Sequence, residues 1–326
     1  MSNRDLHHKS VMCEEVLSIL KPSDNCVYID GTLGAGGHSK KILESAKCSV
    51  IGIDKDPTAI NLCKHLSDKY DNFIAIHGSF ANLSDYLPSL GFAKIDGILL
   101  DLGTSSMQLD NPERGFSFKY NSPLDMRMSQ TGETAYDIVN SLSENSLANL
   151  IYNFGEERKS RKIAKAIIDE RKINKIVTTF DLNKVILKVK KVRNRKIHPS
   201  TKTFQALRIY INHELKDLYH ALISAERVLS EGGKLIVISF HSLEDRIVKN
   251  FIRENSVSYK NYDPSNNDKT FVYQTRRVIK PSAGEIKINR RSRSAKLRWV
   301  VRSSYNYSEL NPTHSFENYG GIECKE

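Results

Sequence analysis

The stretch from Val27 to His38 constrains the fold of this 326-residue chain more than any other part of it. It begins with Val27, Tyr28 and Ile29, an apolar run of β-forming residues that predicts a buried parallel strand. Asp30 follows at the end of this strand, and four glycines come within the next eight positions. Glycine lets the backbone turn sharply and lets a ligand approach the main chain, so the stretch predicts a nucleotide-like cofactor at the first strand-to-helix turn. A glycine-rich loop alone also fits an ordinary tight turn.

Further strand patterns follow, and polar residues stand where several of them end. The sequence predicts strands over residues 50–53, 73–76, 95–100 and 234–240, the last after a turn at 231–233, and a final hairpin of strands over 271–279 and 296–302. Asp54, Asp101 and His241 then share one rim with Asp30. Asp54 lies 20 residues after Gly34, where nucleotide-binding folds hold the ribose hydroxyls. The remaining alternative for Asp54 is a helix cap, although Asp56 before Pro57 already suits that role.

The middle of the chain has a different pattern. After Asp110 the sequence predicts a structured loop and then several helices. Asp181 is the predicted cap of one of these helices. We therefore expect a discontinuous sheet domain over residues 1–109 and 211–326, with a small inserted helical domain over 110–210. Between Ile151 and Asn212 there are 17 Lys and Arg against 5 Asp and Glu, which accounts for the whole net charge of +11. Such a basic insert predicts a polyanion partner such as nucleic acid, or simply solvated helix faces.

Composition excludes several protein classes. No run of 18 apolar residues predicts a membrane span, and no secretory signal is visible, so we expect a cytoplasmic protein. The five cysteines form no C-x-x-C pair, so we expect reduced thiols and no metal site. Residues 255–269 are polar and predict a loop, and Ser242 with Asp245 predicts a capping box.

Two cofactor classes fit the glycine loop. The dinucleotide pattern G-x-G-x-x-G starts at Gly34, but its third glycine is replaced by Ser39. Asp30 would repel a pyrophosphate, yet it could accept a hydrogen bond from a ligand ammonium, directly or through water. The sign of this charge favours S-adenosylmethionine, and the two final strands fit a methyltransferase sheet. Phe80, after the third strand, could stack on an adenine or belong to the core.

Eight motifs resemble those of one protein family, the bacterial 16S ribosomal RNA (cytosine-N(4))-methyltransferase H family, also called MraW. The motifs lie, in order, at residues 30–39, 101–106, 114–118, 123–128, 155–158, 203–208, 238–246 and 293–298. The resemblance runs from about His8 to Arg302. It implies an α/β fold, a class I S-adenosylmethionine-dependent methyltransferase sheet of Rossmann-like type with an inserted helical domain. Ser10, Lys202 and Arg290 depart from the family pattern, and Lys202 loses the bidentate fork of an arginine.

The resemblance also implies a reaction and its residues. The reaction is methyl transfer to the exocyclic N4 amine of a cytidine in the decoding region of 16S rRNA, within the small ribosomal subunit. The implied contacts with S-adenosylmethionine are Gly36, Gly37, His38, Asp54, Phe80, Asp101 and Gln108. Our candidates for holding the cytidine are Asp125, Arg127, Ser239 and His241, although an Asp125–Arg127 pair could simply stabilise its loop and His241 could be a helix-terminal residue. The candidates for binding phosphates are Lys188, Lys190, Lys191, Arg193, Arg195 and Lys196.

The chemistry can be compared with the sequence independently of the resemblance. Methylation at ring carbon 5 needs a cysteine nucleophile, and no cysteine lies between Cys63 and Cys324. This favours direct in-line transfer to an amine without a covalent enzyme intermediate, with no single residue standing out as the catalytic base. Two rival hypotheses remain: a non-catalytic RNA-binding assembly factor with a relic pocket, and a dinucleotide-dependent oxidoreductase. The sequence leaves the oligomeric state open, a homodimer included.

Overall fold

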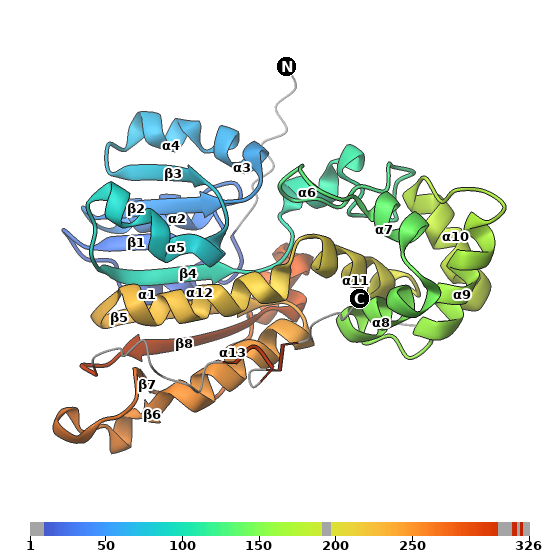
Figure 1. Ribbon diagram of the computed structural model, residues 1–326. Helices are drawn as coiled ribbons and strands as arrows, with labels where there is room; N and C mark the ends of the chain where they lie inside the picture. Colours follow the sequence, from blue (N-terminus) through green and yellow to red (C-terminus); the bar gives the residue numbers. More distant parts are fainter. Residues whose placement is uncertain (1–9, 191–196, 306–314, 318–319, 322–326) are drawn as a thin grey trace. The chain divides into compact units, whose positions relative to one another are not determined.

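A computed structural model describes the chain except for residues 1–9, 191–196, 306–314, 318–319 and 322–326. The chain divides into two compact units (Figure 1). The first, which we call the sheet unit, combines Met1–Gly103 with Leu215–Gly321. The second, the helical unit, is built on Thr104–Glu214, whereas the sequence predicts an insert over 110–210. Within the described residues, no helix combines the length and the apolar character that crossing a membrane requires.

The sheet unit contains an eight-stranded sheet of order β3-β2-β1-β4-β5-β8-β7-β6. Its first five strands are parallel: β1 Val27–Asp30, β2 Ser49–Asp54, β3 Phe73–His77, β4 Ile95–Asp101 and β5 Leu229–Ser239. Helices cover both faces, so the strands bury nearly continuous apolar runs. The strand order reverses between β1 and β4, and ligands of such sheets bind at the carboxyl ends of strands at this switch point. Asp30 and Asp101 end these two strands.

The other edge of the sheet differs from the sequence prediction. β8 Lys296–Arg302 is antiparallel to β5, and β7 Phe271–Tyr273 is antiparallel to β8, but β7 is much shorter than predicted. The loop predicted over 255–269 contains a further strand, β6 Ser256–Ser258, which pairs with β7. The predicted turn at 231–233 is a bulge within β5, because Ile95 pairs with Leu229 but Gly97 pairs with Lys234. β6 has only three residues, which is too few to show an alternation that could be recognised from sequence.

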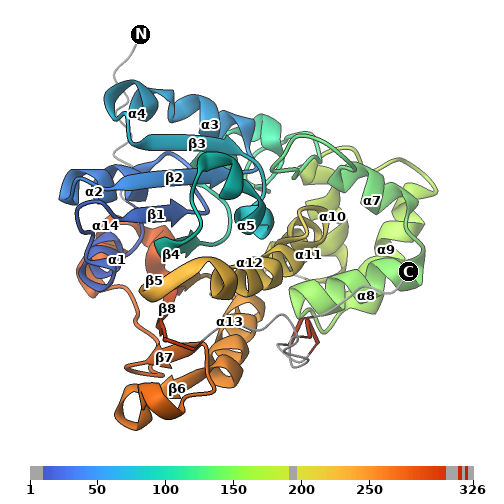
Figure 2. The same cartoon turned by 60° about the vertical axis from the view of Figure 1, so that its left-hand side comes forward.

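The helices of the sheet unit lie on its two faces (Figure 1). They are α1 Cys13–Leu20, α2 Gly37–Ser45, α3 Pro57–Leu62, α4 Lys64–Lys69, α5 Leu83–Tyr86, α12 Glu214–Val228, α13 Ser242–Asn255 and α14 Ala283–Ile288. α5 and α12 share a face, where Ser84 Oγ lies 3.4 Å from Ser224 Oγ. α14 lies beside the start of α1, as Figure 2 shows, and Met12 N donates to Glu285 Oε1 at 2.8 Å.

The helical unit packs amphipathic helices around its own apolar core. The helices are α6 Ser106–Asp110, α7 Ala135–Ser141, α8 Glu144–Gly155, α9 Ser160–Arg171, α10 Thr179–Val189 and α11 Thr201–Ile211. Leu147 and Ile151, four residues apart on α8, are fully buried, and so is Ile163 on α9. The cap of α10 is Thr178 rather than the predicted Asp181, which lies three residues later and completes the capping box.

Candidate functional site at the sheet rim

The glycine loop between β1 and α2 requires its glycines. Gly34 and Gly36 have φ angles of +52° and +75°, a region in which a side chain strains the backbone. A Cβ at Gly31 would lie 2.6 Å from Leu100 Cδ2 and one at Gly37 would lie 2.1 Å from Ser10 Oγ. The glycines therefore allow neighbouring side chains to pack directly against the main chain of this loop. The departure Ser10 packs directly against this loop.

Asp30 shapes the loop from beneath. It is completely buried; its Oδ2 accepts a hydrogen bond from Ser39 Oγ at 2.7 Å and its Oδ1 accepts one from Thr32 N at 3.3 Å. Burial, opposed by the charge of His38, raises the pKa of this carboxyl. Asp30 has no exposed surface, and its hydrogen bonds stabilise its own loop. The structure therefore does not support a direct contact between Asp30 and a ligand ammonium. Ser39 also explains the missing third glycine, because its hydroxyl is needed by Asp30.

His38 and Asp101 form an incompletely satisfied pair at the rim. His38 is 5% exposed, and its Nε2 lies 3.6 Å from Asp101 Oδ2, an ion-pair distance beyond a hydrogen bond. Three atoms of the pair are buried and have no hydrogen-bond partner within the part of the chain that the structure describes: His38 Nδ1, His38 Nε2 and Asp101 Oδ1. Burial lowers the pKa of His38, but Asp101, Cys13 and Asp30 together outweigh it and raise that pKa to about 10. Orphaned buried polar atoms are rare and costly, and they are typical of a site that a ligand completes.

Asp54 ends β2 beside the glycine loop. Its Oδ2 accepts from Gly34 N and its Oδ1 accepts from Asp56 N, both at 2.8 Å. Each carboxylate oxygen keeps a second lone pair for a ligand hydroxyl. Burial raises the pKa of Asp54 to about 6. Asp56 caps α3 with Pro57 at its first position, as predicted, and the ribose contact of Asp54 stays a prediction.

Phe80 lies next to the glycine loop and is half-buried, outside the apolar core. A Cβ on Gly31 would come within 3.1 Å of Phe80 Cβ. Asp217 on α12 ties together the two segments that carry Asp54 and Phe80. It accepts from Ser79 Oγ at 2.7 Å and pairs with the Lys55 ammonium. Sequence reasoning missed Asp217, which is 138 residues away from Ser79.

Two further predicted rim residues have structural contacts of their own. Ser239 is 2% exposed, and its hydroxyl lies 3.4 Å from the Lys296 carbonyl, to which it donates. His241 is the N-cap of α13: its Nδ1 accepts from Glu244 N, and its Nε2 lies 3.0 Å from Glu244 Oε1. The predicted capping box of Ser242 with Asp245 is therefore wrong by one residue, because an imidazole nitrogen takes the place of the usual hydroxyl.

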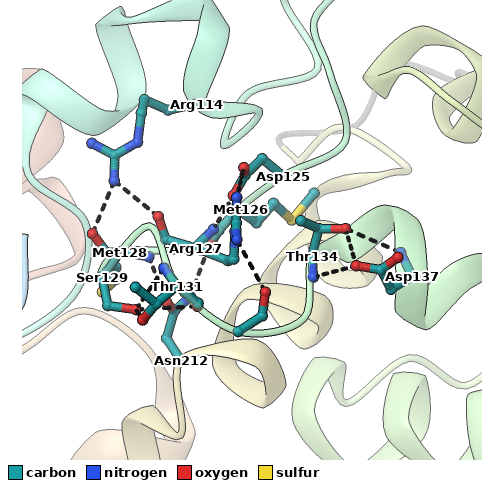
Figure 3. Close-up of polar contacts among 11 residues, drawn as sticks. Arg114, Asp125, Met126, Arg127, Met128, Ser129, Thr131, Thr134, Asp137 and Asn212 are labelled. Carbon is teal, nitrogen blue, oxygen red and sulfur yellow. Dashed lines mark hydrogen bonds and ion pairs between the residues drawn. The ribbon is translucent and has the colours of Figure 1, made fainter.

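In the helical unit, Asp125 and Arg127 form the forked pair that we considered as the structural alternative (Figure 3). Arg127 Nε and Nη2 donate to the two Asp125 oxygens at 2.9 and 2.7 Å. Arg114 Nη2 donates to the carbonyls of Arg127 and Met128, and Asn212 Nδ2 donates to the Met126 carbonyl. These contacts hold Met126 at a φ of +65°. The loop is thus rigidly built, although Asp125 and Arg127 keep about a quarter of their side chains exposed.

The other predicted residues of the helical unit divide between internal contacts and undescribed segments. Lys190 donates to Glu157 at 2.5 Å and to the Pro199 carbonyl at 2.9 Å, and its side chain is only 10% exposed. Its expected binding of phosphates is therefore not supported, because the ammonium is already neutralised. Lys188 pairs with Glu170 at the surface. The four remaining candidates lie outside the described residues: Lys191, Arg193, Arg195 and Lys196.

Gln108 and Lys202 also have local roles. Gln108 Oε1 accepts from Ser105 N at 3.0 Å within the capping box of α6, so its expected contact with the cofactor remains a prediction. Lys202, where the family pattern has an arginine, donates to the Glu156 carbonyl at the end of α8. The Lys202 ammonium satisfies one carbonyl at the end of α8. The replacement of the family's arginine by Lys202 therefore affects how this helix ends.

The rim of buried acids around a glycine loop can be compared with known proteins. The model of the MraW methylase family matches residues 5–303. The chain belongs to this family. Ribosomal RNA small subunit methyltransferase H of Rhodospirillum rubrum is 45% identical over 94% of this chain and 97% of its own. The protein of the same name from a Wolbachia strain of Drosophila simulans is 46% identical over 91% and 99%.

Membership of the MraW methylase family confirms the class predicted from the motifs, a methyltransferase with a class I sheet. It removes the basis of the oxidoreductase hypothesis. The matches span nearly the whole chain, so the helical unit is part of the family architecture.

Proposed function

We propose that this protein transfers a methyl group from S-adenosylmethionine to the exocyclic N4 amine of a cytidine in the decoding region of 16S rRNA, in the small ribosomal subunit. The observation that carries the proposal is the near-complete match to relatives named ribosomal RNA small subunit methyltransferase H. The unsatisfied rim at His38 and Asp101 supports it physically. A protein that acts on ribosomal subunits works in the cytoplasm.

The residues at the rim suit S-adenosylmethionine, which when bound supplies an activated methyl group on a sulfonium. Its methionine part carries both an ammonium and a carboxylate. Asp101 Oδ1 can accept a hydrogen bond from the ammonium, and a protonated His38 can donate one to the carboxylate. Gly36 and Gly37 belong to the loop that ends β1, Asp54 offers acceptors for ribose hydroxyls, and the half-buried Phe80 offers a ring for stacking.

The cysteines support direct transfer without a covalent intermediate. Among the described cysteines, the partly exposed Cys13 interacts with His38, and Cys63 approaches the glycine loop, where its thiol donates to the Gly34 carbonyl at 3.5 Å. The buried position of Cys63 bears on its reactivity. Cys63 is completely buried, and burial raises its pKa to about 12. A thiol held protonated and out of solvent is not a nucleophile. Positioning of the amine, for which Asp125, Arg127, Ser239 and His241 remain candidates, then carries the catalysis.

The test uses small ribosomal subunits from cells that lack this enzyme and methyl-labelled S-adenosylmethionine. We expect label in N4-methylcytidine after digestion of the 16S rRNA to nucleosides. Label in 5-methylcytidine or in the ribose would contradict the proposed acceptor atom. Tight RNA binding without any label would favour the assembly-factor hypothesis instead.

A further inference from the structure

A second basic stretch lies in the sheet unit, outside the basic insert. Residues 276–294, which we call the rim segment, contain seven Lys and Arg against one acid, Glu285, which accepts from Met12 N. All seven cationic residues are exposed: Arg276, Arg277, Lys280, Lys287, Arg290, Arg291 and Arg293. The rim segment is therefore a concentrated positive surface, and ordinary helix faces balance such charge with acids.

Two cationic residues of the neighbouring strand, β8, have an acidic partner. Lys296 and Arg298 of β8 both pair with Asp245 of α13, at 2.9 and 2.8 Å. Both cations therefore have an acidic partner within the fold, although the one carboxylate offsets only one of the two positive charges. The contrast lies within one short stretch of chain, so the positive surface of the rim segment is not a general property of this edge of the sheet.

The end of the rim segment is a fixed turn. Ser292 and Ala295 are buried, and Ser292 Oγ donates to the Asn289 carbonyl at 2.7 Å. Asn289 caps the turn by accepting from Arg291 N. Arg293 Nη1 reaches back to the Arg290 carbonyl at 3.3 Å, which leaves most of its five donors for other partners. A pinned turn that presents arginines to solvent loses little entropy when it binds a ligand.

The strand register places this turn at the rim that carries the cofactor candidates. β8 begins at Lys296, which pairs with Ser239, the last residue of β5. The turn of Arg290–Ser294 directly precedes β8, so it lies at the carboxyl edge of the parallel strands, as do Asp30 and Asp101. Ile279 bridges Leu297 close to the same edge and brings Lys280 with it.

We propose that the rim segment binds the phosphodiester backbone of the small-subunit RNA beside the acceptor nucleotide. This rests on the proposed function, because it takes RNA as the substrate. Arginine forks match phosphate oxygens in pairs, and exposed cations release counterions when they bind a polyanion. The sheet unit would then hold the nucleotides next to the methylated base through its own surface, independently of the basic insert.

The test compares the full-length wild type with the double variant Arg290→Ser/Arg293→Ser. Filter binding of 16S rRNA over a range of salt concentrations measures affinity directly. We expect roughly tenfold weaker binding and a salt slope reduced by about two, one unit for each phosphate contact. Affinity for S-adenosylmethionine and the unfolding temperature should stay at wild-type values.

Two controls separate charge from its location. Lys64→Ser/Lys69→Ser removes the same charge from α4 and should change affinity less than twofold. Arg290→Lys/Arg293→Lys keeps the charge and should keep the salt slope. Equal losses in the α4 variant, or an unchanged slope in the arginine-to-serine variant, would overturn the inference. Because RNA binding is measured without methyl transfer, a wild type that binds RNA but adds no methyl group would refute the proposed function and leave this inference standing.

Discussion

At the rim of the sheet unit, His38 is shielded from solvent and Asp101 is partly exposed, yet three buried polar atoms of this pair have no hydrogen-bond partner among the described residues. In the helical unit, Glu157 and Lys190 are similarly shielded, but they bind each other at 2.5 Å. A buried polar group without a partner lowers stability by about 1–3 kcal/mol, so it persists where a ligand satisfies it. A buried pair needs no ligand. A buried charged group therefore indicates a candidate ligand site only where the fold leaves some of its polar atoms without hydrogen-bond partners.

The largest effect of a substitution on these two pairs is expected on the stability of the helical unit. Glu157→Ala leaves the Lys190 ammonium buried beside the Pro199 carbonyl without a countercharge. We expect a loss of about 3–5 kcal/mol in the unfolding free energy of this unit, measured by urea denaturation. Glu170→Ala removes the exposed partner of Lys188 and should lower the unfolding free energy by less than about 1 kcal/mol. Equal losses in the two variants would show that the buried pair has no special weight.

A smaller effect, on binding, is expected at the rim. Asp54→Ala removes the proposed ribose acceptors and the bond to Gly34 N, and should weaken S-adenosylmethionine binding by roughly 10- to 100-fold in calorimetry. RNA affinity should remain within about twofold of the wild type. Asp56→Ala is the matched control, because it removes a neighbouring carboxylate that caps α3 and should mainly lower stability. Equal loss of cofactor and RNA binding would make Asp54 a structural residue.

The pKa of Asp54 predicts a further effect at the rim. Burial raises this pKa to about 6, so the carboxylate is ionised above that value and protonated below it. Ribose hydroxyls donate to the ionised form, and at pH 5 only about a tenth of it remains. S-adenosylmethionine should therefore bind about tenfold more weakly at pH 5 than at pH 7.5. His38, with a pKa of about 10, stays charged throughout. Asp54→Asn should flatten this dependence, and a profile that persists in that variant would assign it to another group.

The smallest effect is expected at Asp217, which acts through its neighbours. Asp217→Asn removes the charge that pairs with Lys55 and weakens the contact with Ser79, so the segments carrying Asp54 and Phe80 should loosen. We expect a roughly fivefold higher KM for S-adenosylmethionine with kcat unchanged at saturation. Asp85→Asn, an exposed acid on α5, is the control. A fall in kcat without a change in KM would contradict a positioning role.

Much of the sheet unit could be predicted from its sequence. The strands β1 to β4 have dense apolar runs, and each ends at a glycine or a polar residue, so periodicity and turn chemistry locate them. The rim acids follow from this, because parallel strands bring their carboxyl ends to one edge. β6 escaped prediction because it has three residues and gains its order from pairing with β7.

The partners of the polar side chains could be predicted much less well. Lys190 looks like a phosphate ligand in sequence, and its burial depends on Glu157, 33 residues earlier. His241 looks like a rim ligand, and its cap depends on a backbone turn one residue earlier than expected. The forked contact of Asp125 with Arg127 is local, yet the loop around it is held by Arg114 and Asn212 from other segments.

The sequence by itself determined the class of the protein, the sheet with its glycine loop, and the acids at its rim, because local periodicity and motif spacing encode these features. The tertiary structure decided which charges remain available. It neutralised Lys190, made Asp30 a support of its own loop, left His38 and Asp101 incomplete and exposed the arginines of the rim segment. The physical reason is that the availability of a charge depends on neighbours distant in sequence, which only the folded chain brings into contact.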